Sequence, residues 1–585
     1  MKPSYEYKKF CVFFLMGMLI LMGNLILSSS GCSKNVENGD QSQLEGYPIA
    51  SDIFTTLQRT VVPDATPSGS DTLLPYEVSK YEQNGYGKWH YGPGIDSVKR
   101  FDIMPATYSG ASATNTARLL NFFAMTDIHI TDKESPTQGI ALGYKGGSSS
   151  AYSPVMLSTT QVLDAAVQTI NAIHKQNPFD FGISLGDTCN STQYNELRWY
   201  IDVLDGKNIN PDSGAKDDPV PGPYNDYQDE YKAAGLDETI NWYQALGNHD
   251  HFWTGFLPPN DYIRQNLIGE DIVNLGNPFI DPLGLASRGS YMGSIDGRTP
   301  LGDIIGVGPV AQFTTPPKVL AADPDRRSLS PQEWMSEFLK TSSNPVGHGF
   351  TQANVDNDFA SYSFEPKSDM PIKVIVLDDT QKNDDINNPD SLGYGHSFLD
   401  NERYDWLVSE LDKGQAEGKL MVIAAHIPIG VEPAPSMMGW SSTAPISEAQ
   451  LISKLHEYPN FILWIAGHRH ENIVTAFKSP DADRPELGFW QIETSSLRDF
   501  PQQFRTFEIL RNSDNTVSIF TTDVDTAVKD GSLAAISRSY AVAAQELFNN
   551  PLGPSPTGSY NEELVKQLSP EMQAKIQSYG TPIGN

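Results

Sequence analysis

Short apolar runs that stop at polar, metal-binding residue types recur five times along the chain. Each run has the length and composition of a strand buried in a sheet, and Asp, Asn or His follows within two positions. In open α/β sheets, ligands bind outside the carboxyl ends of the strands. We therefore expect the five polar stops to converge on one site. The runs are LLNFFAM before Asp127 and His129, FDFGISL before Asp187, INWYQAL before Asn248, His249 and Asp250, KLMVIAA before His426, and NFILWIA before His468 and His470.

The segments between these runs show the spacing of amphipathic helices. Helices are predicted over 159–175, with Ser158 or Thr159 as the cap, and over 401–413, 447–456 and 534–548. Further strands are predicted in PIKVIVLDD, which starts at Pro371, and in the hairpin-like pair FRTFEIL and TVSIFTTDV. Strands that alternate with helices indicate the α/β class.

The length of 585 residues suggests one large domain with insertions, or two to three units. We expect a signal peptide over 1–31, a tether and irregular segment over 32–116, the main α/β domain over 117–530, and a partly helical extension over 531–585. Between about 252 and 370 the regular pattern gives way to a Pro- and Gly-rich stretch. That stretch is too long for a simple connection, so we interpret it as an insertion near the site.

The amino terminus has the order of a secretory signal. Three lysines precede an apolar stretch over 10–27, and small residues then lead to Cys32. The sequence SSGC at this point resembles the lipobox of bacterial lipoproteins, although Ser29 stands where that motif usually has Leu. The prediction is lipidation at Cys32, and the alternative is an uncleaved membrane anchor, since the apolar stretch is long enough to span a bilayer. Both place the chain outside the cytoplasm, attached to a membrane.

The charge of the chain is strongly negative. It has 41 Lys and Arg against 72 Asp and Glu, which gives a net charge of −31. Such a surface repels a nucleic-acid backbone, so the composition disfavours nucleic acid as a partner. Small phosphorylated substrates remain compatible with it.

The residue types at the strand ends are those of a catalytic metal centre. Asp127 and His129 stand close enough to reach one ion, and Asp187 can offer two carboxylate oxygens to two ions. Asn248 adds a carbonyl oxygen. The remaining three histidines, His426, His468 and His470, add imidazole nitrogens, which favour Fe, Mn, Zn, Co or Ni over Mg or Ca. The chain has no CxxC pair, so a structural zinc site is disfavoured.

In their order, the motifs DIH, GD, GNHD, a separate His before Ile-Pro, and GHRH resemble the calcineurin-like metallophosphoesterases. The resemblance covers roughly 119–525 with the long insertion excluded, and it implies a sandwich of two mixed β-sheets flanked by helices, with 117–530 as the catalytic domain. It also implies roles for the strand-end residues. By resemblance, one metal is held by Asp127, His129 and His470, the other by Asn248, His426 and His468, and Asp187 bridges them, while His249 stands at the leaving group and Asp250 orients it.

Two positions separate the chain from the purple acid phosphatases, a branch of this superfamily. That branch has Gly where His129 stands and a Tyr ligand where this chain has Asn190. The resemblance therefore implies a phosphomonoesterase or phosphodiesterase that uses a metal-bridged hydroxide and two divalent or trivalent transition-metal ions. The alternative is a lipoprotein that binds a ligand on the same fold without turning it over. The sequence leaves the substrate and the identity of the metals open.

Overall fold

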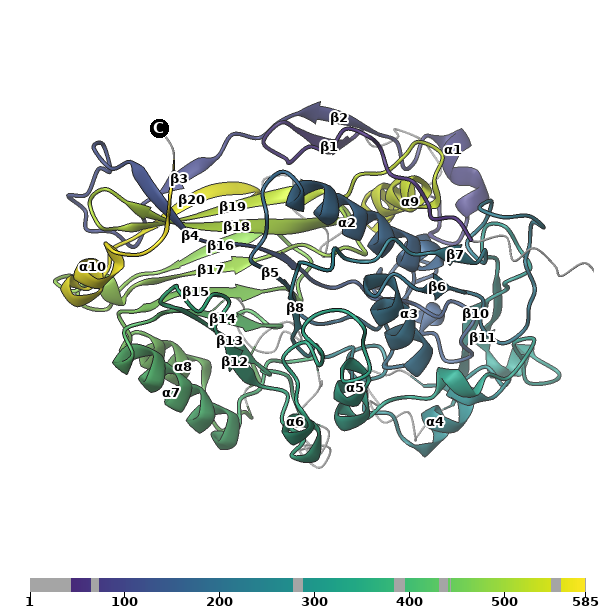
Figure 1. Ribbon diagram of the computed structural model, residues 1–585. Helices are drawn as coiled ribbons and strands as arrows, with labels where there is room; N and C mark the ends of the chain where they lie inside the picture. Colours follow the sequence, from purple (N-terminus) through teal and green to yellow (C-terminus); the bar gives the residue numbers. More distant parts are fainter. Residues whose placement is uncertain are drawn as a thin grey trace, which may run out of the picture. The chain divides into compact units, whose positions relative to one another are not determined.

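Two mixed β-sheets and the helices that flank them make up most of the structure (Figure 1). The computed structural model describes residues 44–64, 73–276, 288–382, 395–430, 440–441, 443–548 and 559–583. The predicted signal peptide and Cys32 lie outside these residues. The α/β class, with two mixed sheets and flanking helices, is as the sequence predicts.

The first sheet has six strands in the order β12-β13-β14-β15-β17-β16. Four neighbours, β13, β14, β15 and β17, run parallel, and the edge strands β12 and β16 run antiparallel to them. The strands are β12 (Tyr362–Phe364), β13 (Ile372–Leu377), β14 (Leu420–Ala425), β15 (Phe461–Ala466), β16 (Ile473–Phe477) and β17 (Phe489–Glu493).

The second sheet has eight strands, seven of them in the order β3-β20-β19-β18-β4-β5-β8, with β21 paired to β4. β4, β5 and β8 run parallel, whereas β18, β19 and β20 continue the sheet as an antiparallel meander. The strands are β3 (Val98–Arg100), β4 (Asn115–Met125), β5 (Phe181–Ser184), β8 (Trp242–Gln244), β18 (Gln503–Asn512), β19 (Val517–Asp525), β20 (Asn561–Lys566) and β21 (Thr581–Pro582).

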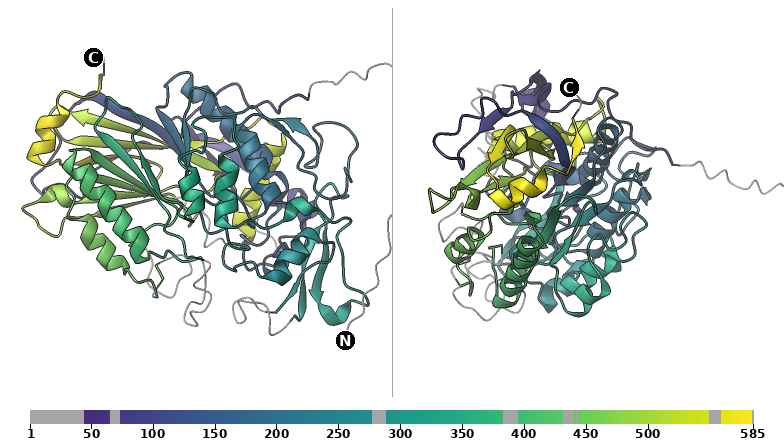
Figure 2. Two further views of the ribbon diagram at one scale, coloured as in Figure 1. Left: turned by 60° about the horizontal axis from the view of Figure 1, so that its bottom comes forward. Right: turned by 60° about the vertical axis from the view of Figure 1, so that its left-hand side comes forward.

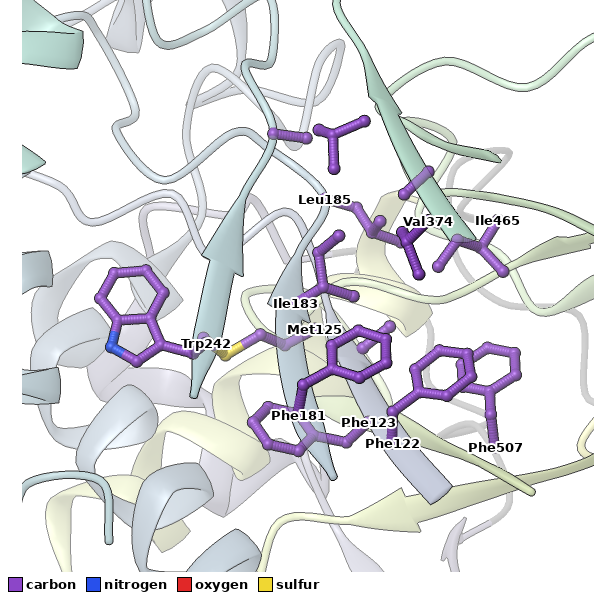
Figure 3. Packing of buried hydrophobic residues seen from close by; sticks show 14 of the residues in the cluster. Phe122, Phe123, Met125, Phe181, Ile183, Leu185, Trp242, Val374, Ile465 and Phe507 are labelled. Atoms are coloured by element: carbon purple, nitrogen blue, oxygen red, sulfur yellow. The ribbon is translucent and has the colours of Figure 1, made fainter. Parts of the chain in front are cut away.

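One continuous core includes the residues between the two sheets, and along β4 it includes residues of both faces, such as Phe122 and Phe123. Along β13, Val374 and Val376 belong to this inner core, whereas Ile375 and Leu377 face the other way. On the side of the eight-stranded sheet, the ring of Phe122 stacks at 4.7 Å on both Phe181 and Phe507 (Figure 3). Packing of these side chains thus stabilises the strands of both sheets.

Helices cover the outer faces. α7 (Asn401–Ala416) and α8 (Glu448–Leu455) pack on the outward residues of β13, β14 and β15 (Figure 2). α2 (Thr159–His174) and α3 (Tyr194–Leu204) bury their apolar stripes in the main core, and α9 (Leu533–Phe548) contacts α2. The predicted helices over 159–175, 401–413, 447–456 and 534–548 are confirmed. The other helices are α1 (Tyr81–Asn84), α4 (Asp261–Ile268), α5 (Pro331–Phe338), α6 (Gln352–Asp356) and α10 (Pro570–Ile576).

Shorter sheets lie outside the two main ones, and most of them fall within 32–116 and 252–370, the segments that the sequence leaves irregular. They pair β1 (Arg59–Pro63) with β2 (Trp89–Pro93), β6 (Asn208–Ile209) with β7 (Tyr231–Lys232), and β10 (Ser290–Ile295) with both β9 (Asn274–Leu275) and β11 (Ile304–Pro309). Among the described residues, no helix is both long enough and apolar enough to cross a membrane.

Candidate metal centre

The polar stops predicted from the sequence lie just beyond the carboxyl ends of strands in both sheets. β4, β5 and β8 are parallel neighbours, and Asp127, Asp187 and Asn248 follow them. In the six-stranded sheet, β14 and β15 are parallel neighbours, followed by His426 and His468. The two sheets therefore bring residues from distant parts of the chain to one buried place.

A first group of donor atoms consists of Asp127 Oδ1, His129 Nε2 and His470 Nε2. The two imidazole nitrogens are 3.2 Å apart, and Asp127 Oδ1 lies 3.2 Å from His470 Nε2 and 3.8 Å from His129 Nε2. All three side chains are buried. Their spacing lets one ion contact all three.

A second group is centred on His426 Nε2. Asn248 Oδ1 lies 2.9 Å from that nitrogen, Asp187 Oδ2 3.2 Å and His468 Nδ1 3.3 Å. The amide nitrogen of Asn248 donates to the carbonyl of Gly255, which turns its oxygen toward the group. This arrangement places one oxygen and two imidazole nitrogens beside a carboxylate.

Asp187 connects the two groups through one oxygen. Its Oδ2 lies 3.2 Å from His426 Nε2 and 3.7 Å from His129 Nε2, which belong to different groups. The other oxygen, Oδ1, accepts a hydrogen bond from the backbone N–H of His249 at 2.8 Å. That bond fixes the carboxylate with Oδ2 between the two groups.

The donor set fits two transition-metal ions. Ligand atoms about 2.0–2.2 Å from one ion lie about 3.0–3.5 Å from each other in tetrahedral or octahedral coordination, close to the separations found here. Asp127 Oδ1 is buried without a hydrogen-bond partner among the described residues. The second oxygen of Asp127 accepts bonds from Thr126 and from the backbone N–H of His468. One oxygen of Asp127 is thus fixed, and the other lies unsatisfied beside two imidazoles. A bound ion would satisfy this second oxygen.

Most of the candidate ligands have a left-handed backbone, which only a minority of residues other than Gly adopt. Such conformations concentrate at functional sites, where the surrounding structure enforces them. Glycines make room for the turns, because a Cβ at Gly247 would collide with Asp187, and one at Gly467 with Thr126 and Asp127. The ligand residues with positive φ are Asp127 at 51°, His129 at 47°, Asp187 at 51°, His468 at 71° and His470 at 58°.

Each group pairs one imidazole of high pKa with one of low pKa. Burial lowers the pKa of His426 and His470, but the carboxylates of Asp187 and Asp127 outweigh it and raise both to about 10. Burial lowers the pKa of His129, and burial together with the charge of His426 lowers that of His468 to about 3. The carboxylates of Asp187 and Asp127 therefore favour one protonated imidazole in each group, that of His426 and that of His470.

Asp499 holds His470 from behind. Its Oδ2 lies 2.6 Å from His470 Nδ1, so this nitrogen carries the proton and Nε2 is turned toward Asp127. Burial opposes ionisation of Asp499, but Arg498 and His470 lower its pKa to about 2. A carboxylate behind a metal-binding imidazole fixes its tautomer and raises its basicity. No sequence pattern points to Asp499, which lies 29 positions from His470 and follows none of the predicted strand runs.

His249 does not belong to the second group, but one of its ring nitrogens lies within 4.8 Å of donor atoms of His129 and Asp187. Its Nδ1 is 2.7 Å from the backbone carbonyl of Asn190 and therefore carries a proton. The ring packs against that of His129 with 4.4 Å between centroids, and the side chain lines a cavity. Burial lowers the pKa of His249 to about 3, despite the nearby charge of Asp187. In the free protein the imidazole is thus neutral at pH 7, with its Nε2 lone pair available.

The predicted role of Asp250 in orienting His249 is wrong. Both carboxylate oxygens of Asp250 accept hydrogen bonds from the loop that follows β5: from the backbone N–H groups of Asp187, Thr188 and Cys189, and from the hydroxyl of Thr188. Oδ2 also accepts the N–H of Gly247. Asp250 therefore shapes the turn that presents Asp187, and the carbonyl of Asn190 takes over the orientation of His249.

A cavity of about 260 Å³ opens beside these groups. His129, Asp187, His249 and other residues of the candidate centre line it. The lining also includes the apolar residues Leu142, Ala151 and Phe256. Arg469 also contributes to the wall, and its guanidinium binds Glu493 at 2.7 and 3.0 Å.

The structure is thus a mixed α/β protein with buried His and Asp groups that could hold two ions. Neither a comparison with protein-family models nor one with curated proteins gives a match. Among solved structures, the chain is similar to a dimetal phosphatase from Danio rerio, with 10% sequence identity and a TM-score of 0.37. The similarity covers 70% of this chain and 100% of that one. At this level of likeness, function has to be argued from the site itself.

Proposed function

We propose that the protein is a phosphoesterase that depends on two transition-metal ions. The observation that carries the proposal is the pair of donor groups that share Asp187 Oδ2. Asp127, His129 and His470 would hold one ion, and Asn248, His426 and His468 the other. Two bound ions supply a water of lowered pKa and a clamp for the phosphoryl oxygens.

In this proposal His249 acts on the leaving group. The Asn190 carbonyl fixes the proton on Nδ1, so Nε2 is the atom that would meet a substrate in the cavity. Burial disfavours the imidazolium in the free protein. An anionic phosphoryl group beside Nε2 favours it, so the proton would be taken up with the substrate and passed to the departing alkoxide.

The walls of the cavity favour a compact alcohol. Leu142, Ala151 and Phe256 offer apolar surface, and the guanidinium of Arg469 is already paired with Glu493. A second phosphate would need an unpaired cation there. We therefore propose a small phosphomonoester or phosphodiester with an apolar alcohol as the substrate, rather than a nucleoside polyphosphate.

The test combines metal analysis of the purified chain with a screen of phosphomonoesters against phosphodiesters. Two ions per chain and hydrolysis that is lost in Asp187→Asn would support the proposal. Metal-loaded protein that binds phosphate but hydrolyses none of the esters would instead favour the ligand-binding alternative. Attachment to a membrane through Cys32, outside the cytoplasm, is part of the proposal and rests on the amino-terminal sequence alone.

A further inference from the structure

A second cluster of carboxylates lies apart from the histidine-rich centre. Glu134 follows β4 by nine positions, and Asp212 and Asp217 belong to the segment between β6 and β7. One carboxylate oxygen from each lies within 4.8 Å of the others. Glu134 is only 5% exposed. The cluster contains no imidazole, and its residues are not ligands in the proposed function.

Several acceptor atoms of this cluster are buried without a donor. Asp212 Oδ1, both carboxylate oxygens of Asp217 and Gln228 Oε1 have no hydrogen-bond partner among the described residues. Gln228 is 3% exposed, and its Nε2 lies 2.7 Å from Glu134 Oε2, so its amide is directed at the cluster. Buried oxygens normally have a partner, and four without one in the same place indicate a missing positive ligand.

The nearby cations also have other partners. Lys133 and Arg298 are the cations that act on the cluster, but the ammonium of Lys133 bonds to the carbonyl of Pro211 at 2.6 Å and the guanidinium of Arg298 to Asp296 at 2.8 Å. The cluster thus gathers three carboxyl groups in one place, and a divalent cation bound among them would favour their ionised forms. Burial and the neighbouring carboxylates raise the pKa of Glu134 to about 8 and that of Asp212 to about 6, against the opposing effect of Lys133. Ionising these carboxyl groups in the buried cluster therefore costs free energy.

Other carboxylates in the same region have hydrogen-bond donors, in contrast to those of the cluster. Asp132 is fully buried, and Arg326, Ser213 and Asn195 bond to its oxygens. In the other acidic group, Asp229 Oδ2 accepts two backbone N–H groups of its own loop. These acids have donors in place, whereas Asp212 Oδ1 and both carboxylate oxygens of Asp217 have none among the described residues.

We propose that Glu134, Asp212, Asp217 and Gln228 bind one calcium ion. The ligands are all oxygens once the Gln228 amide is turned by half a rotation, which exchanges two atoms that are alike in shape. Carboxylate and amide oxygens suit Ca²⁺, whereas the imidazoles of the other centre suit transition metals. The ion would tie the 210–230 segment to the loop that follows β4, and that loop begins with Asp127 and His129.

The test measures calcium binding directly, with the transition-metal concentration held constant. Isothermal titration of the purified chain with CaCl₂ should give one site, and saturating Ca²⁺ should raise the melting temperature by a few degrees. The double change Asp212→Asn and Asp217→Asn should abolish both effects. Asp218→Asn, an exposed neighbour, should retain them.

A second readout separates binding from a merely structural role. In calcium-free buffer the double variant should melt no lower than the parent chain, because it removes carboxylates that repel each other. Terbium, which takes calcium sites, should give sensitised luminescence with the parent chain that Ca²⁺ competes away. No heat and no calcium-sensitive luminescence in the parent chain, or a double variant that binds like the parent, would overturn the proposal. Transition-metal content should stay unchanged in the double variant, so failure here is distinguishable from failure of the phosphoesterase proposal.

Discussion

Replacing Asp499 by Asn tests whether the carboxylate behind His470 sets metal affinity. The two side chains have nearly the same shape, and an amide oxygen can still accept from His470 Nδ1, which lies 2.6 Å from the native carboxylate. The change therefore removes negative charge with little change in packing. Without that charge the imidazole is a weaker base and holds its ion less tightly.

The expected loss is 10- to 100-fold in affinity for one ion, the usual scale for such outer partners, or about 1.4–2.7 kcal/mol. The affected ion is the one contacted by Asp127, His129 and His470, since Asp499 bonds only to the last of these in the described structure. The affinity of the second ion should change much less.

The assay is a competition titration against a chelating dye, with metal content checked after dialysis. Asp205→Asn is the matched control, because the Asp205 carboxylate is also inaccessible and has fixed partners, but these are Lys207, Ser342 and Ser343, not an imidazole. The reasoning is refuted if Asp499→Asn binds both ions as tightly as the parent chain, or if the control loses as much affinity.

Four further predictions follow from the site and the amino terminus. Asp187→Asn should lose both ions and hydrolysis together, and full occupancy by metal analysis would contradict the shared-oxygen assignment. Because the pKa values of His426 and His470 are raised to about 10, metal loading at pH 8 should release about two protons, measured as a dependence of the binding heat on the buffer. In the metal-free protein, the contribution of the protonated His426 and His470 to the free energy of unfolding is fully present below pH 6.5 and is lost toward pH 10. In His249→Ala, turnover of alkyl esters should fall by about 10²–10⁴ and that of aryl esters by less, with metal content retained; equal losses would exclude a general acid. Mass spectrometry should find the mature amino terminus at a lipidated Cys32, and an unmodified terminus elsewhere would count against it.

The strands and the donor residues could be predicted from the sequence because both are local patterns. A run such as FILWIA can hardly be anything but a buried strand, and β15 covers these residues. The polar stop after it is fixed by sequence adjacency, so its place at the sheet edge follows from the strand. The same reasoning places Asp127, Asp187 and His426.

The partners of these residues could not be predicted, because they arise from contacts between distant segments. Asn190 orients His249 through a backbone carbonyl, which every residue type has. Asp250 looks like the partner of its neighbour in sequence, yet its side chain turns toward the β5 loop. The strand β20, NEELVK, is too polar to be recognised alone and becomes a strand by pairing with β19.

Both sheets contribute residues to the two donor groups, and this affects how the two sheets can separate locally. Asp127, His129 and Asp187 follow strands of the eight-stranded sheet, whereas His426, His468 and His470 follow strands of the six-stranded one. Ions bound by ligands from both sheets would link the two sheets across the edge of the sandwich. Local separation of the sheets there would require release of the ions, so exchange of the strand-end amides would report metal occupancy and slow as the centre fills.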